Sequence, residues 1–183
     1  VSVSINISAK TFELNNISES ILKIIGDVNI DPGRVEIEIT ETSMLLNAEE
    51  TINKIKKLTE NDIKIALDDF GTGYSSLSFL RDIPFNRIKI DRSFIKDIES
   101  NIHSIAIIKA IAGIGDALGV SITAEGVETA SQISLLMRDK CYEHQGYYIS
   151  KPFEQTHILP WILSYESEIV SGTLTEKEQI CLV

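Results

Sequence analysis

The 183-residue sequence predicts an α/β protein in which helices pack on a parallel sheet. Two observations lead to this fold class: short strand-like runs alternate with helix-like segments along the whole chain, and no linker or low-complexity segment interrupts them. Such alternation is typical of βα units. Periodicity leaves two architectures open, an open doubly wound sheet and part of a (β/α)₈ barrel, which needs eight strands.

The first half of the chain contains three predicted strands, at residues 1–8, 35–40 and 63–70. They are rich in β-branched residues or alternate apolar with polar residues. A turn is predicted at 31–33 and a short helix near 75–82. The helix near 18–28 places one set of apolar residues on one face: Ile17, Ile21, Ile24, Ile25 and Val28. The helix near 48–60 is predicted to bury Ile52 and Ile55 and to expose its lysines.

The second half continues the pattern with strands at 87–91 and 121–127 and a short strand near "HQGYY", residues 144–148. The helix near 103–118 repeats apolar residues at helical spacing, at Ile107, Ile111, Ile114 and Leu118. The apolar residues of two later helices are Ile133, Leu136, Met137, Ile158, Trp161, Ile162 and Tyr165. Residues 170–183 are predicted to form a weakly structured tail.

Composition excludes several classes of function. The net charge of −10 and the absence of a Lys/Arg cluster argue against binding to polymeric nucleic acid. No apolar run approaches the roughly 20 residues that cross a bilayer, so no membrane contact is expected from this segment. Cys141 and Cys181 do not form a disulfide framework and are compatible with a reducing cytoplasm.

Polar residues fall near the carboxyl ends of the predicted strands, where parallel βα folds gather their functional groups. They are Asn6, Glu38, Asp68, Asp69, Lys89, Asp91, Glu125 and Gln145, with Glu41 just beyond the second strand. Singly, several have an ordinary explanation: Glu38 could be solvated beside Glu36, Lys89 could lie at the surface, and Gln145 could belong to a turn. Such an ordinary explanation is less satisfactory for the adjacent pair Asp68 and Asp69, because buried carboxylates must be paired or metal-bound.

Together, one Asn, two Glu and two Asp at successive strand ends would form a set of oxygen ligands, which suits Mg²⁺ or Mn²⁺. Adjacent aspartates can serve two metals roughly 3.5–4 Å apart, which activate a water and stabilise a phosphate transition state. Lys89 would orient the water or a phosphoryl oxygen. The loop "FGTGYSS" could cradle a phosphate, but a flexible loop with Ser75 or Ser76 as a helix N-cap is the simpler interpretation.

Five motifs in order resemble the EAL-domain phosphodiesterases, which hydrolyse the bacterial second messenger cyclic di-GMP. They are "SINIS", "EIEITET", "LDDFGTGYSSLSFLRDIPFNRIKIDRSFI", "TAEGVET" and "CYEHQGYYISKP". The resemblance implies a TIM-like (β/α)₈ barrel with one antiparallel strand. Here it would be an incomplete barrel of about six βα units, with residues 1–169 as the C-terminal portion of an EAL domain and 170–183 as the tail.

The resemblance also implies roles for individual residues. The metal-site residues would be Asn6, Glu38, Asp68, Asp69 and Glu125, and the catalytic residues Lys89, Glu125 and Gln145. Glu41 resembles the glutamate that anchors the loop after Asp69, and that loop would form a homodimer contact. Asp91 and Pro152 are expected to bind substrate. The implied cofactors are two divalent cations, Mg²⁺ or Mn²⁺, the ligand is cyclic di-GMP, and the setting is a bacterial cytoplasm.

The Glu-Ala-Leu segment of the family precedes the strand that matches "SINIS", and this chain starts at that strand. We therefore expect a longer parent protein to be active and this chain alone to be impaired, since one metal ligand would be absent. Because an incomplete barrel exposes an unpaired strand edge, the chain is also expected to dimerise, recruit another segment or be poorly stable. Two other functions remain: a degenerate EAL domain that binds cyclic di-GMP without cleaving it, and an interaction domain that has lost ligand binding.

Overall fold

The computed structural model describes residues 1–41, 43, 48–73, 80–170 and 179–180. Their strands form one parallel sheet in sequence order, β1 to β7. The strands are β1 (Val3–Asn6), β2 (Val35–Thr40), β3 (Lys64–Phe70), β4 (Arg87–Ile90), β5 (Ser121–Glu125), β6 (Glu143–Gln145) and β7 (Gln179–Ile180). The six predicted strands are therefore confirmed in order and approximate position; β2 has the predicted bounds, and the others are shorter.

Helices follow most of the strands. They are α1 (Ala9–Phe12), α2 (Ile17–Asp27), α4 (Ala48–Thr59), α6 (Arg92–Ile95), α7 (Ile102–Leu118), α8 (Ala130–Arg138) and α9 (Ile158–Val170), with 3₁₀ turns η1 (Pro32–Arg34) and η2 (Gln155–His157). Local sequence explains the ends of α7: the Asn101 side chain accepts a hydrogen bond from the His103 amide, and Gly119 adopts the left-handed conformation that ends many helices.

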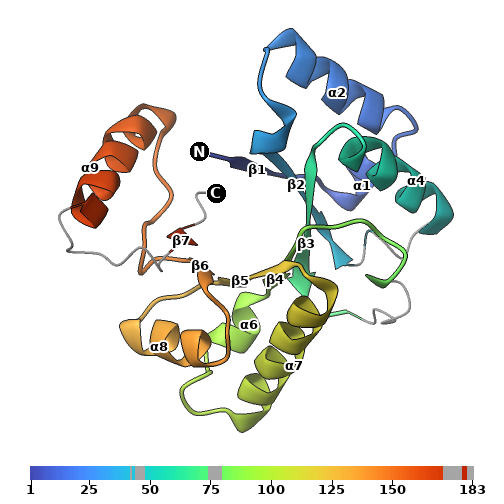
Figure 1. Cartoon of the computed structure of the whole chain (residues 1–183). Coiled ribbons are helices and arrows are strands. Elements are labelled where there is room, and N and C mark those ends of the chain that lie inside the picture. The colour runs from blue at the N-terminus through green and yellow to red at the C-terminus, as the bar shows by residue number, and fades with distance from the viewer. Residues whose placement is uncertain (42, 44–47, 74–79, 171–178, 181–183) are drawn as a thin grey trace.

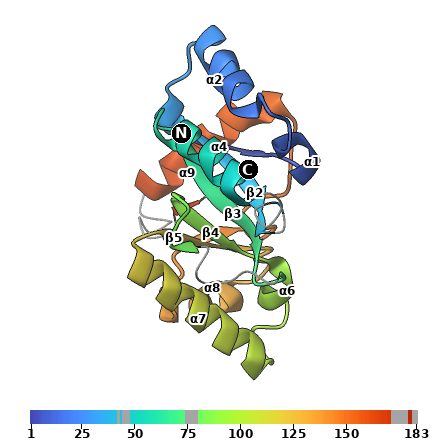
Figure 2. The same ribbon diagram turned by 90° about the vertical axis from the view of Figure 1, so that its right-hand side faces the viewer.

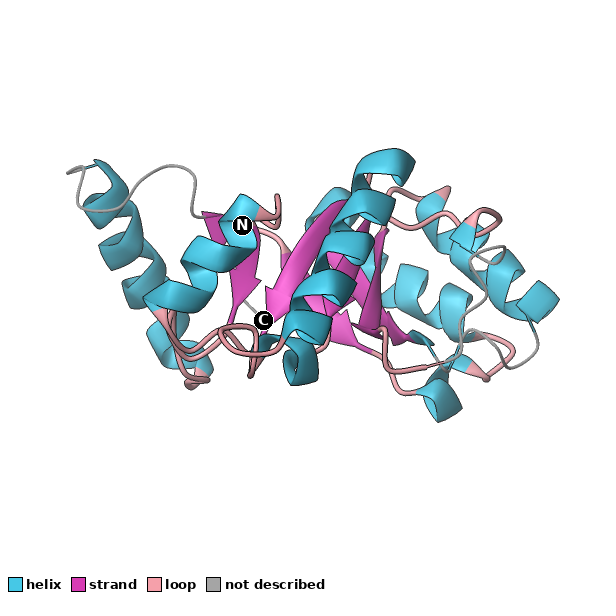
Figure 3. Ribbon diagram, turned by 90° about the horizontal axis from the view of Figure 1, so that it is seen from below, coloured by secondary structure: helices cyan, strands magenta, loops and turns pink. Residues whose placement is uncertain are grey.

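The sheet curls into an incomplete barrel (Figure 1). Helices α2, α4, α7 and α8 lie along its convex side, and Figure 2 shows α7 and α8 below the strands. Viewed from below, the strands lie among the helices (Figure 3). An open doubly wound sheet would have helices on both faces. The curled sheet therefore supports the incomplete barrel and excludes the open doubly wound sheet.

The convex face of the sheet is apolar and forms the core with the helices. Its side chains are nearly or completely buried: Ile37, Ile39, Ile65, Leu67, Ile88, Ile90, Ile122 and Ala124. Gly115 lets α7 approach β5 closely, since a Cβ atom there would lie 2.5 Å from Ile122 Cδ1. Because side chains alternate along a strand, the residues between these apolar positions point to the concave side of the sheet.

The structure corrects four details of the sequence prediction. Helix α7 buries Ser104, Ile108, Ile111, Ala112 and Gly115, whereas Ile107 and Leu118 are exposed. Of the four predicted core residues, Ile111 is buried and Ile114 packs against the core, so the prediction was right for these two and wrong for Ile107 and Leu118. This helix is apolar on several sides, so spacing alone did not define its buried face. In α2, Ile24 and Val28 are likewise exposed, and burial is centred on Ile17, Ser18 and Ile25.

The other two corrections concern Lys54 and the C-terminal third. Lys54 of α4 is buried, because its ammonium group donates to the carbonyls of Phe12 and Glu13 at the end of α1. The strand predicted at "HQGYY" ends at Gln145, and β7 pairs with β6 within the predicted tail. The helix predicted near 75–82 falls mainly on residues 74–79, outside the described residues. No helix in the described part of the chain has the length and apolar character of a membrane span.

Candidate metal centre

The strand β3 is irregular at the two adjacent aspartates. Its register with β4 shifts between Leu67 and Phe70, and Asp69 has a φ of 54°, in the left-handed region. In a regular strand, neighbouring side chains point to opposite faces. The irregularity instead lets Asp68, Asp69 and Glu125 each place a carboxylate oxygen within 4.8 Å of the others.

Lys89 of β4 lies at the centre of the surrounding polar groups. Its Nζ atom is 2.6 Å from Glu125 Oε1, 2.7 Å from Glu38 Oε2 and 3.4 Å from Asp68 Oδ1. The side chain is only 3% exposed, so Lys89 is not a surface lysine. Asn6 of β1 donates from Nδ2 to Glu38 Oε2 at 2.8 Å.

Six residues of the concave face thus gather near the carboxyl ends of strands β1 to β6. We call this set the upper layer; it consists of Asn6, Glu38, Asp68, Lys89, Glu125 and Gln145, with Asp69 beside it at the irregular strand end. The register places Gln145 next to Glu125. The structure therefore brings together the residues that the sequence predicts as metal-site and catalytic.

Burial dominates the electrostatics of the upper layer. It raises the pKa of Glu125 to about 7, although the Lys89 ammonium opposes that rise, and it also raises the pKa of Glu38. Burial and the neighbouring Asp68 and Asp91 carboxylates raise the pKa of Asp69. Burial lowers the pKa of Lys89, but Glu125 and Glu38 raise it by more, so the ammonium form is favoured. One lysine thus faces several carboxylates whose ionisation is costly.

Two buried oxygen atoms in this layer have no hydrogen-bond donor among the described residues, Asp68 Oδ1 and Gln145 Oε1. Buried polar atoms are usually satisfied, and an absent ion is one reason for an exception. Carboxylate and amide oxygens are also the ligands that Mg²⁺ and Mn²⁺ prefer. The donor set therefore fits divalent cations.

Glu41 lies just beyond β2 and contacts the loop that follows Asp69. Its Oε2 atom accepts a hydrogen bond of 3.0 Å from the Gly71 amide. A Cβ atom at Gly73 would lie 2.7 Å from Glu41 Oε1, so the loop backbone passes close to this buried carboxylate. This contact is the one expected of a loop-anchoring residue.

Of the two predicted substrate-binding residues, Asp91 lies beside Asp69, and the two side chains interact directly. The Asp91 carboxylate accepts a hydrogen bond from the Ser93 amide and caps α6, and its charge acts on Asp69. Pro152 is exposed in the segment before η2.

A second polar set, which sequence reasoning did not single out as a site, lies on the same face toward the amino ends of the strands. We call it the lower layer; it consists of Ser4, Glu36, Arg87, Thr123 and Glu143. Glu36 and Glu38 are both buried, so neither is a solvated strand residue. The spacing of residues in the sequence could have identified the lower layer, because each of its members precedes a member of the upper layer by two residues.

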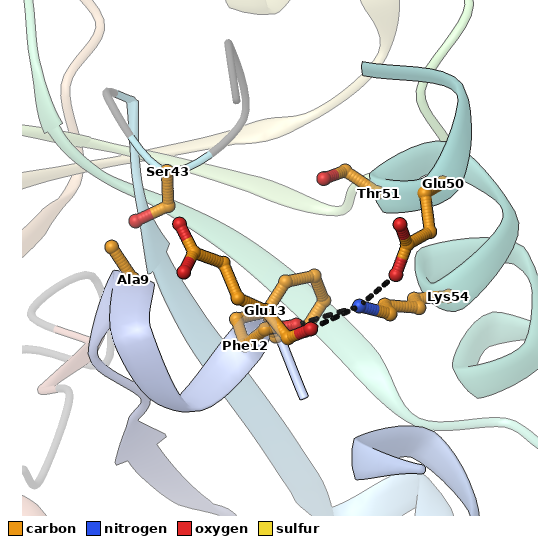
Figure 4. A pocket seen from close by; sticks show the side chains of 7 residues that line it. All are labelled: Ala9, Phe12, Glu13, Ser43, Glu50, Thr51 and Lys54. Atoms are coloured by element: carbon orange, nitrogen blue, oxygen red, sulfur yellow. Dashed lines mark hydrogen bonds and ion pairs between the residues drawn. The ribbon is translucent and has the colours of Figure 1, made fainter. Parts of the chain in front are cut away.

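A small cavity of about 10 Å³ lies away from both layers, between α1, α4 and Ser43 (Figure 4). In Figure 4 the Lys54 ammonium group reaches the carbonyls of Phe12 and Glu13 and the Glu50 carboxylate. This volume holds about one water molecule, so the cavity is too small for an organic ligand.

Comparison with known proteins gives one family. Residues 1–152 match the model of the EAL domain. The cyclic di-GMP phosphodiesterase PdeR of Escherichia coli is 32% identical over 163 residues, which are 89% of this chain and 25% of that protein. The chain spans only 20% to 23% of the length of four other curated relatives that it matches.

Solved structures of the same kind superpose on the chain. The PaMucR phosphodiesterase in complex with c-di-GMP is 32% identical, with a TM-score of 0.83 over 86% of this chain and 64% of that one. The Klebsiella pneumoniae BlrP1 complex with manganese and c-di-GMP is 28% identical, with a TM-score of 0.76 over 82% of this chain and 39% of that one.

Proposed function

The chain belongs to the EAL domain family, and from this premise we propose that its upper layer supports metal-dependent hydrolysis of cyclic di-GMP to linear 5′-pGpG. One observation carries the proposal: buried carboxylates converge around a single lysine and leave Asp68 Oδ1 without a donor. Relatives named as cyclic di-GMP phosphodiesterases and a neighbour crystallised with manganese support it.

Asn6, Glu38, Asp68, Asp69 and Glu125 would hold two divalent cations, Mg²⁺ or Mn²⁺. When bound, such cations supply Lewis acidity, lower the pKa of a water and stabilise the charge that develops on the phosphate. The shared closeness of Asp68, Asp69 and Glu125 makes these three the strongest ligand candidates.

The chain's own residues would position the reactants. Lys89 stays protonated between Glu38 and Glu125, so its ammonium group can donate a hydrogen bond to the attacking water or to a phosphoryl oxygen. Gln145, with Oε1 unpaired beside Glu125 among the described residues, can accept a hydrogen bond from that water and fix its orientation.

Three further assignments are part of the proposal. Glu41 would hold the loop after Asp69 through its bond to Gly71, and Asp91 and Pro152 would contact substrate at the rim. The homodimer contact that was predicted for this loop falls mainly on residues 74–79 and stays a prediction.

The test is turnover of cyclic di-GMP in the presence of Mn²⁺, followed by chromatography of the product. Two proteins are compared: the 183-residue chain, and the same chain preceded by the Glu-Ala-Leu segment of a family member. We expect 5′-pGpG from the extended protein and much less from the chain alone, because the resemblance assigns one metal ligand to that segment. Asp68→Asn should abolish turnover, and Asp116→Asn, an exposed carboxylate on α7, is the matched control.

Two results would contradict the proposal. Binding of cyclic di-GMP by both proteins without turnover would favour the degenerate binding domain. An unchanged melting temperature on addition of nucleotide and Mn²⁺ would favour an interaction domain that binds neither. Full activity of the 183-residue chain would instead overturn the expectation that it is impaired.

A further inference from the structure

We infer that the lower layer is a positioning device for the upper layer, and that Arg87 is its central positioning residue. The inference rests on the proposed metal centre, because it concerns how that centre acquires its spacing. It assigns a role to five residues that touch neither the proposed cations nor the substrate.

The two layers share their strands. Each residue of the lower layer sits two positions before a residue of the upper layer, on the same strand and the same face, roughly 6–7 Å below it. The pairs are Ser4 and Asn6, Glu36 and Glu38, Arg87 and Lys89, Thr123 and Glu125, and Glu143 and Gln145. Whatever fixes the separation of the lower members therefore fixes that of the upper members.

Arg87 makes contacts across the curled sheet in both directions. Its Nε atom lies 2.9 Å and 3.1 Å from the two carboxylate oxygens of Glu36 on β2. Its Nη1 atom lies 2.7 Å from Thr123 Oγ1 on β5 and forms an ion pair with Glu143 on β6. One guanidinium group thus ties β4 to three other strands.

Two hydroxyl groups extend this network. Ser4 Oγ donates to Glu36 Oε1 at 2.8 Å, which includes β1, and Thr123 Oγ1 donates to Glu143 Oε2 at 3.0 Å, which links β5 directly to β6. The intervening strand β3 places Ala66 between the two layers, in register with Glu38 on β2 and with Arg87 on β4. Its small methyl group leaves room for the Arg87 side chain to reach Glu36.

The chemistry of arginine suits this role. Its planar guanidinium presents several donors in a fixed fork and stays charged, so it holds two carboxylates and a hydroxyl in set directions. The Arg87 side chain is 15% exposed and Glu36 is 6% exposed, so water competes little for these bonds. Metal centres tolerate small errors in ligand position poorly, and the upper layer shows no comparable fork of its own.

The experiment measures Mn²⁺ affinity by electron paramagnetic resonance in the full chain, at a temperature where every variant is folded. The variants are Arg87→Met, Arg87→Lys and Thr123→Val. The matched controls are Lys54→Met, which removes a buried cation bound to α1, and Ser18→Ala, which removes a buried hydroxyl bound to the Lys54 carbonyl.

We expect Arg87→Met to weaken Mn²⁺ binding about tenfold, by analogy with residues behind metal ligands. Arg87→Lys should give part of this loss, and Thr123→Val a smaller one. Both controls should bind Mn²⁺ like the wild type, although they lose stability. If Arg87→Met does not fold, Arg87→Lys and Thr123→Val carry the test.

If Arg87→Lys and Thr123→Val bind Mn²⁺ with the same affinity as their controls, the inference is wrong. The proposal of a metal centre is unaffected by that result. Failure of the wild type to bind Mn²⁺ sinks the proposed metal centre instead. Crystal structures then decide the inference: it holds if the Asp68, Asp69 and Glu125 oxygens separate beyond 4.8 Å in Arg87→Lys, and it fails if their spacing is unchanged.

Discussion

The upper and lower layers lie on the same face of the same sheet, yet they balance charge differently. In the lower layer Arg87 meets two carboxylates, Glu36 and Glu143, and two hydroxyl groups complete the hydrogen bonds. In the upper layer one cation, Lys89, meets three carboxylates, and Asp69 brings a fourth close by.

The difference shows how a structural polar network can be told from one that requires ions. A structural network satisfies its atoms with protein groups. The upper layer has more buried carboxylates than the described residues neutralise, and it leaves Asp68 Oδ1 without a donor. The upper layer has four carboxylates to one lysine, against two carboxylates to one arginine in the lower layer, and this larger excess of negative charge supports the proposed cations.

The largest expected effect comes from removing the cation of the upper layer. Lys89→Met should lower the free energy of unfolding by about 3–5 kcal/mol at neutral pH, because it leaves buried carboxylates unpaired. Urea unfolding measures the loss. Mn²⁺ should recover part of it if cations replace the missing charge, and an unchanged free energy of unfolding would contradict the central place given to Lys89.

Metal binding should stabilise the wild type by somewhat less. At a Mn²⁺ concentration of about 100 times the dissociation constant, the free energy of unfolding should rise by about 2.7 kcal/mol. The double variant Asp68→Asn with Asp69→Asn should lose this increase, and a chelator should reverse it in the wild type. Equal stabilisation of the double variant would place the bound cations elsewhere.

The stability of the metal-free chain should depend on pH, because ionising the buried carboxylates of the upper layer is costly. Burial raises the pKa of Glu125 from 4.5 to about 7, so the folded chain binds more protons than the unfolded chain between these values. Its free energy of unfolding should therefore fall as pH rises through this window, by about 3 kcal/mol from Glu125.

Urea unfolding of wild type and Glu125→Gln in the presence of a chelator, at about pH 5 and about pH 8, isolates this contribution. The variant should lack the decrease, and Mn²⁺ should reverse its sign in the wild type, since cations favour the ionised carboxylate. Equal pH slopes in the two proteins would falsify this account of Glu125.

The smallest effect should come from the lower layer. Thr123→Val keeps the shape of the side chain and removes one hydroxyl, so the free energy of unfolding should fall by about 1 kcal/mol. Because no carboxylate loses its cation, the decrease should be the same at about pH 5 and about pH 8. A strongly pH-dependent loss would mean that the lower layer is as poorly balanced as the upper one.

Sequence reasoning predicted the fold class, the six strands and the residues that gather in the upper layer, because strand ends in parallel βα folds meet at one edge. It identified only part of the buried face of α7, Ile111 and Ile114, since an all-round apolar helix has a weak periodic signal. It also left Lys54 at the surface, because a helix pattern does not reveal the carbonyls at the end of α1 that bind it.

The remaining features depend on tertiary structure. Arg87 looks like an ordinary strand residue until the curled sheet brings Glu36 and Glu143 to either side of it. The alternation of apolar and polar residues also did not predict the irregular register of β3. In a regular strand the side chains of Asp68 and Asp69 would point in opposite directions. In both cases the decisive neighbours are far apart in sequence.

The left-handed backbone at Asp69 makes two separate demands on a single position. The backbone conformation disfavours nearly every residue except glycine, asparagine and aspartate. A charged oxygen ligand rules out glycine and makes asparagine the weaker choice. Stereochemistry and the proposed metal coordination thus favour the same amino acid independently, because aspartate meets both demands.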